Sequence, residues 1–143
     1  CLGWALSAGQ DDGLLQVRSQ RLITLLHLCN ATCEERLAYA AQLATQFSRN
    51  RESVEEVLTL WISWWRDLLL AKGSNTGFVT NIDQESVLLH QAEAYSLRQI
   101  KSFIGSIKAA LQQLDQNASP RLVLDVLMLN MPSGRHCEKN GTQ

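Results

Sequence analysis

The chain has few residues that break helices and almost no excess charge. Only two prolines and eight glycines interrupt its 143 residues, and 13 basic side chains face 14 acidic ones. Long uninterrupted segments are therefore available, and no overall field draws the chain to nucleic acid or to an anionic membrane. Because 45% of the residues are hydrophobic, a single domain of this size can bury a core without disulfides.

Sequence motifs for catalysis and metal binding are also missing. There is no glycine-rich phosphate loop, no H-E-x-x-H and no G-x-S-x-G. His27 and His90 stand beside leucines, and no residue is evident that would orient either of them as a base. Cys29 and Cys33 lack the second pair of ligands that a closed zinc site needs. We therefore expect no catalytic site, no metal and no cofactor.

The four cysteines are unevenly spaced, with Cys1 and Cys137 close to the two ends of the chain. Such spacing is not typical of a secreted disulfide framework, so we expect reduced cysteines and a cytoplasmic location. Three N-x-S/T sequons, at Asn30, Asn117 and Asn140, are compatible with secretion, but so short a motif recurs by chance.

Residues 54–72, VEEVLTLWISWWRDLLLAK, hold three of the four tryptophans and predict a helix in the middle of a bundle. We expect Trp61, Trp64, Trp65 and Leu68 in the core; a ligand pocket lined by the tryptophans is the alternative. The polar positions form one narrow stripe, which consists of Glu55, Glu56, Thr59, Ser63, Arg66 and Asp67. Charges within the stripe would be costly in a bilayer, which argues against a membrane span.

Helix-start signals divide the first half of the chain. Asp11 and Asp12 are expected to cap a helix that runs to Cys29, and Thr32 with Glu35 forms a capping box for the next helix. The apolar face expected for the first of these helices contains Leu15, Leu22, Leu25, Leu26 and Cys29, and the inward face expected for the second contains Leu37, Ala41, Ala44 and Phe47.

The second half begins after a loop that we expect over residues 73–82. Asp83 is expected to cap one helix and Ser96 to open a longer one, in which Phe103 and Ile107 belong to the core. Gly105 lies within that longer helix and costs about 1 kcal/mol relative to alanine, so we expect another backbone to pass close to it. Basic residues give the same helix a mildly charged face, but no aromatic residues alternate with them as single-strand binding would require; they are Arg98, Lys101 and Lys108.

The last predicted helix covers residues 120–130, with Pro120 at its first position. Its apolar residues surround most of its circumference, whereas a terminal helix can hide only one face. We therefore expect Leu124 and Met128, with Arg121 beside them, to face outward and to form a subunit interface. Residues 133–143 are polar and turn-rich, and we expect them to be disordered.

No segment alternates with the period of two that a strand requires. The expected fold is thus all-α, a bundle of about five to six mainly antiparallel helices joined by short links.

Three stretches, taken in order, resemble the delta-prime subunit of the bacterial DNA polymerase III clamp loader. They are CLGWAL, WWRDLLLAKG followed by TNID, and NASPRLVLDVLML. The resemblance covers most of residues 1–132 and implies that residues 1–10 are the tail of a preceding lid domain and residues 11–132 a helical collar domain. The chain then looks like a piece of a longer protein whose nucleotide-binding-like domains lie upstream.

That resemblance also implies a function. The fragment would be a non-catalytic oligomerisation domain that contacts the delta and gamma/tau subunits in the ring that loads the sliding clamp during DNA replication. It would reach DNA only through this polymerase complex in the bacterial cytoplasm, and it would bind no membrane and no small-molecule substrate. ATP-hydrolysing relatives carry an arginine where Gly3 stands here, which fits the delta-prime type; gamma/tau is the nearest alternative.

Two readings from other classes remain open. A self-contained helical regulatory or cytokine-like module is mildly favoured by the cysteines and sequons, and an enzyme fragment whose site lies elsewhere is the other. Measuring the intact mass with and without reducing agent separates the secreted, cytokine-like hypothesis from the clamp-loader hypothesis, because disulfides or glycans count against a bacterial cytosolic origin.

Overall fold

The computed structural model describes residues 8–72 and 85–132, and the side chains of these residues except 8–12, 14 and 85–89. Within these ranges the chain forms six helices and no strand, which confirms the all-α fold class. The helices are α2 (Ala8–Cys29), α3 (Cys33–Arg49), α4 (Arg51–Lys72), α5 (Glu85–Ala94), α6 (Leu97–Asp115) and α7 (Pro120–Asn130). The expected tail at 133–143, the loop at 73–82, the Asp83 cap and most of the lid-domain tail lie outside the described residues.

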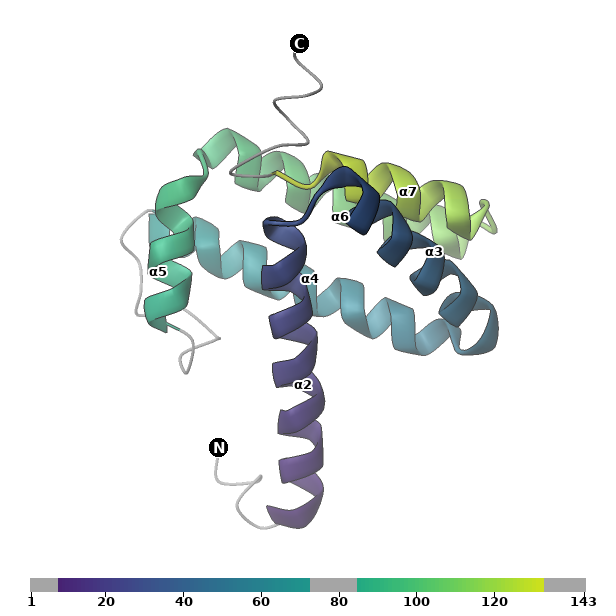
Figure 1. Ribbon diagram of the computed structural model, residues 1–143, viewed down its shortest axis with the longest axis horizontal. Helices are drawn as coiled ribbons and strands as arrows, with labels where there is room; N and C mark the ends of the chain where they lie inside the picture. Colours follow the sequence, from purple (N-terminus) through teal and green to yellow (C-terminus); the bar gives the residue numbers. More distant parts are fainter. Residues whose placement is uncertain (1–7, 73–84, 133–143) are drawn as a thin grey trace.

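Four of the helices pack in a closed ring, α3–α4–α6–α7, in which each contacts the next and α7 returns to α3. Figure 1 shows that α3 and α4 run in opposite directions, as do α4 and α6, and α6 and α7. The other two helices, α5 and α2, are outside this four-helix ring. Helix α5 packs against α4 at one end, and α2 crosses α4 and projects away from it (Figure 1).

Local signals place most of the helix ends where the sequence predicts them. The Thr32 side chain accepts from the Glu35 amide at 3.2 Å, and Glu35 Oε1 accepts from the Thr32 amide at 2.9 Å, which completes the capping box. Ser96 and Gln99 form the same reciprocal pair at the start of α6. Pro120 occupies the first turn of α7, as expected.

The start of α2 differs from the prediction. The helix begins at Ala8 and already includes Asp11 and Asp12, so these residues are not its caps. Gly9 lies within the helix, which one glycine weakens by only about 1 kcal/mol relative to alanine. Leu15 is about half exposed, because this part of α2 extends past the ring.

The core is centred on α4. The six core residues expected from the sequence have at most 1% of their surface exposed; they are Trp61, Trp64, Trp65, Leu68, Phe103 and Ile107. Trp65 packs against Phe103 with ring centroids 5.0 Å apart and against Tyr95 with centroids 5.1 Å apart. Trp64 Nε1 donates to Gln91 Oε1 at 2.7 Å. The tryptophan cluster is therefore the central packing unit of the bundle.

Three expectations about side-chain environment are wrong. Asp67 is fully buried, although it stands in the predicted polar stripe of α4. Apart from its own helix, no atom of the described residues lies within 4 Å of a Cβ added to Gly105, so no described backbone passes close to this glycine. In α3 the fully buried face is Arg36, Ala40 and Leu43, and the predicted inward residues Leu37, Ala41, Ala44 and Phe47 are partly exposed beside it. The face of α3 is rotated because α3 packs against both α4 and α7.

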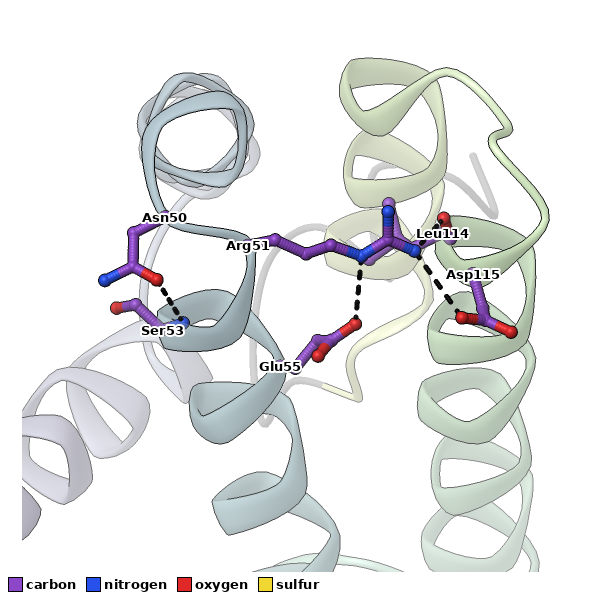
Figure 2. A network of polar contacts seen from close by, with 6 residues as sticks. All are labelled: Asn50, Arg51, Ser53, Glu55, Leu114 and Asp115. Atoms are coloured by element: carbon purple, nitrogen blue, oxygen red, sulfur yellow. Dashed lines mark hydrogen bonds and ion pairs between the residues drawn. The ribbon is translucent and has the colours of Figure 1, made fainter.

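The first turn of α4 is tied to the last turn of α6 by Arg51 (Figure 2). Its Nη2 donates to the Leu114 carbonyl oxygen at 3.0 Å and lies 3.5 Å from the Asp115 carboxylate, while its Nε lies 3.3 Å from Glu55 Oε2. The Leu114 carbonyl oxygen also accepts from the Asn117 amide at 3.2 Å, so Arg51 adds a second bond at the C-terminal end of α6. Exposed ion pairs of this kind contribute little on their own, so this contact chiefly sets the register of the two helices.

Candidate interaction surface

Helix α7 carries the residues that the sequence assigns to a subunit contact. The Ser119 hydroxyl accepts from the Leu122 amide at 3.4 Å and starts the helix, and Pro120 follows at a position that needs no amide hydrogen. Arg121 and Asp125 then pair across one turn at 3.2 Å on the outside of the helix. Arg121 is thus exposed, as expected.

The other two residues of the predicted interface are buried. Leu124 and Met128 have no exposed surface, so the prediction that they face outward is wrong. The reason is that α7 lies between α3 and α6 and contacts both. Its inward face is therefore wide and takes up Val123 and Leu127 as well.

The outward face of α7 is nevertheless apolar. Leu122 is 64% exposed, and Val126 and Leu129 are each 50% exposed. These three residues, spaced i, i+4, i+7, line one side of the helix and are called the α7 stripe below. Exposed leucines are common singly, but three on one helix face form a contiguous apolar surface that fits a contact with another protein.

The surface beside the stripe is suited to close approach of another helix. A shallow groove runs between α6 and α7, and Val126 is one of its apolar walls; its lining residues are Ser106, Ala109, Ala110, Gln113, Val123, Val126, Leu127 and Asn130. The α6 side of the groove consists mostly of small side chains. Leu129 borders a second hollow with Arg98, Gln99 and Ser102. The apolar stripe therefore has a polar rim, as protein interfaces usually do.

A second set of exposed apolar residues lies on α2. Leu15, Val17 and Ile23 are each about half exposed. Val17 borders an open groove between α2 and α4, in which Arg21 Nη1 lies 3.4 Å from Glu56 Oε1. This groove mixes acidic, basic and apolar residues, so it gives no clear preference for one kind of ligand.

The structure shows the surroundings of the histidines and cysteines that the sequence suggested for chemistry. His27 and His90 are exposed, and the described residues contain no group of three potential metal ligands. Cys29 is a free and buried thiol whose pKa is raised to about 11 because burial penalises the thiolate. A thiol in that state is not a nucleophile at neutral pH. Cys33 is disulfide-bonded, so the expectation of reduced cysteines is wrong for this residue.

The sequence did not predict the burial of two charged residues. Arg36 and Asp67 are fully buried. Arg36 lies at i−4 and i−7 from Ala40 and Leu43, so a helical wheel centred on those two residues would have put a cation on the inward face. For Asp67 the sequence contains no comparable signal.

Within the described residues, no helix combines the length and the apolar character that crossing a membrane requires. Comparison with other proteins adds no relative: no protein-family model, no curated protein and no solved structure matches the chain.

Proposed function

We propose that this chain is a non-catalytic oligomerisation domain of a bacterial clamp-loader subunit of the delta-prime type. Its role would be to join the delta and gamma/tau subunits in the ring that loads the sliding clamp, with DNA reached only through the complex in the bacterial cytoplasm. Support comes from the three resembling stretches in their order and from the all-α fold, which suits a collar domain.

The observation that carries the proposal is the α7 stripe. It lies within NASPRLVLDVLML, the last of the three resembling stretches, and it presents Leu122, Val126 and Leu129 to the outside. Apolar side chains that stay exposed on a well-packed helix are the kind of surface that a neighbouring subunit covers. A stable contact would bury about 800 Å² on each partner, so the stripe would be its centre and the α6–α7 groove part of its rim.

The test is co-elution of this chain with delta and gamma/tau subunits on a sizing column. Leu122→Asp and Val126→Asp place a charge in the centre of the proposed contact, and we expect both variants to lose co-elution. Ile23→Asp on α2 is the matched control, because it makes the same kind of change at a residue of similar exposure. If both α7 variants keep the parent's helical circular dichroism and still co-elute, the stripe is not the contact and the proposal loses its support.

A second candidate function is a self-contained helical regulatory or cytokine-like module. The disulfide at Cys33 favours it, and so does the exposed Asn30 of a sequon, because disulfides and glycans belong to oxidising compartments. Intact mass of the natural protein, measured with and without a reductant, separates the two candidates. A disulfide or glycan on the protein isolated from its own cells supports the module, and a fully reduced, unmodified chain supports the clamp-loader domain.

A further inference from the structure

Helix α2 is buried mainly near its C-terminal end. Among its described side chains the buried ones are Leu22, Leu25, Leu28 and Cys29, all in the last two turns and a half, whereas residues 15–17 are exposed. Figure 1 shows the helix projecting from the four-helix ring like an arm. The ring itself closes through contacts among α3, α4, α6 and α7, so it does not need α2 for its closure.

Local hydrogen bonds satisfy some of the carbonyl oxygens at the C-terminal end of α2. The backbone amide of Asn30 donates to the His27 carbonyl oxygen at 3.1 Å, and its side-chain amide lies 3.4 Å from the Leu26 carbonyl oxygen. The Ala31 amide donates to Leu28 at 3.1 Å. These bonds satisfy carbonyls that every helix leaves open at its C-terminus, but they all stay within the α2–α3 link.

Arg36 makes the long-range connection. Its Nε donates to the Leu28 carbonyl oxygen at 2.9 Å and its Nη2 to the Cys29 carbonyl oxygen at 3.2 Å, both at the end of α2. The same guanidinium donates to Met131 at 2.7 Å and to Pro132 at 3.2 Å, just after α7 and 95 or more residues along the chain. One buried cation thus holds the ends of two helices, whose negative dipole ends favour it.

A chain of polar side chains makes a second attachment at the same place. The side chains of Tyr95 and Gln91 lie beside the buried Cys29 thiol, and Gln91 also accepts the indole hydrogen of Trp64. The contact therefore reaches from the last residue of α2 through the end of α5 to the centre of α4. These contacts and the four apolar residues lie in one short segment of α2, and nearer its start Arg21 Nη1 lies 3.4 Å from Glu56 Oε1 of α4 in a solvent-exposed pair.

We propose that α2 is a releasable arm that undocks as a unit at residues 30–32 while the α3–α4–α6–α7 ring stays folded, and that Arg36 is the positioning residue that keeps it docked. The physical basis is the separation of the two sets of contacts. Opening the arm breaks the Arg36 hydrogen bonds to Leu28 and Cys29 and the exposed Arg21–Glu56 pair, and it exposes one apolar patch, but it leaves the contacts among α3, α4, α6 and α7 intact. Elements with few buried contacts are the ones that open by themselves in native proteins. This inference does not depend on the proposed function.

Cys29 is a natural probe of the opening, because its thiol becomes reachable only when the end of α2 leaves the core. We expect alkylation of Cys29 under native conditions, followed by mass spectrometry of its peptide, to proceed by local opening in the parent protein. Replacing Arg36 by methionine should raise that rate by at least about tenfold, the factor that corresponds to ~1.4 kcal/mol. Hydrogen exchange of the α6 amides should change far less.

Three comparisons make the test specific. Arg36→Lys keeps the charge but loses the planar fork, so it should raise the Cys29 rate by less than Arg36→Met does. Arg121→Met removes an exposed arginine of α7 and should leave the rate unchanged. Leu58→Ala in α4 weakens the whole bundle, so it should speed Cys29 labelling and α6 exchange together.

The parent protein keeps the proposal testable if Arg36→Met does not fold. In low urea, labelling of Cys29 and exchange of the α2 amides should occur with less urea dependence than exchange in α6, because the opening exposes less surface. If Cys29 labelling follows α6 exchange in step, in the parent and in the variants, then α2 does not open by itself and the proposal is wrong.

Discussion

Leu68 has no exposed surface and lies in α4 among the tryptophans. Replacing it by alanine removes methylene groups from a packed interior and leaves a cavity, so we expect a loss of ~2 to 5 kcal/mol in the free energy of unfolding. Leu122→Ala is the matched control, since the same atoms are removed from a side chain that is 64% exposed. Urea melts of both variants make the measurement. A loss below about 1 kcal/mol for Leu68→Ala would show that the site is not packed as described.

Gly105 of α6 differs from Leu68 because the space beside it is open rather than packed. A methyl group added there meets no atom of the described residues beyond its own helix within 4 Å, and the residue has an ordinary helical backbone rather than a positive φ. Gly105→Ala should therefore stabilise the protein by about 0.4 to 1 kcal/mol, because alanine restricts the unfolded chain and favours the helix. Thermal and urea melts test this. A loss of stability would mean that this surface of α6 contacts something that the fold does not show.

At the scale of the element, the start of α6 depends on one hydroxyl. The Ser96 side chain accepts from the Gln99 amide at 3.1 Å, and Gln99 Oε1 accepts from the Ser96 amide at 2.9 Å. Ser96→Ala removes the first of these bonds and should cost ~0.5 to 2 kcal/mol. The control is Ser102→Ala in the same helix, at an exposed position one turn and a half further on, where alanine is the better helix former. Equal effects of the two changes would argue against a role for the cap.

Helix α7 shows where reasoning at this scale stops. Its cap, its proline and its length are predicted by neighbours within four residues, and the structure has them. Which side faces inward is a different question. Because both sides of the helix are apolar, hydrophobic periodicity could not separate the buried pair Leu124 and Met128 from the exposed Leu122 and Val126. Only the position of α7 between α3 and α6 decides it.

At the scale of the whole molecule, buried acids predict a loss of stability at high pH. A thiol is neutral when protonated, and burial raises the folded pKa of Cys29 from 9.0 to about 11. The folded state therefore keeps this proton at pH values where the unfolded chain has lost it. The contribution of the protonated Cys29 thiol to the free energy of unfolding is fully present below pH 9.0 and is lost as the pH rises toward about 11. Burial raises the pKa of Tyr95 and of Tyr39 as well, so these two phenols also lower the stability of the folded state as the pH rises.

The expected loss from Cys29 alone is on the order of 2–3 kcal/mol between these two limits. Urea melts at about pH 8 and about pH 10.5 measure how steeply the free energy of unfolding falls with pH. Cys29→Ala should be less stable than the parent at the lower pH, because it leaves a small cavity, but its stability should fall less with pH. If the parent and the variant lose stability equally, the pKa of Cys29 does not differ between the folded and unfolded states, and this account of the alkaline loss fails.

The sequence by itself determined the fold class, most helix ends and the members of the central core. These depend on short-range rules: a hydroxyl reaches an amide three residues away, a proline restricts the first turn, and apolar residues recur with the helical period. Trp61, Trp64 and Phe103 are large enough, and flanked by enough apolar residues, that any compact arrangement of this bundle would bury them.

Tertiary structure alone decided the environment of the polar residues and of the helices with two apolar sides. Arg36 is buried because the ends of α2 and α7, far apart in sequence, bring four carbonyl oxygens to one point. No local pattern encodes such a meeting, since it depends on how the helices cross. The same holds for the projection of α2 and for the α7 stripe, because the surface left uncovered on a helix is set by the neighbours that pack against its other sides.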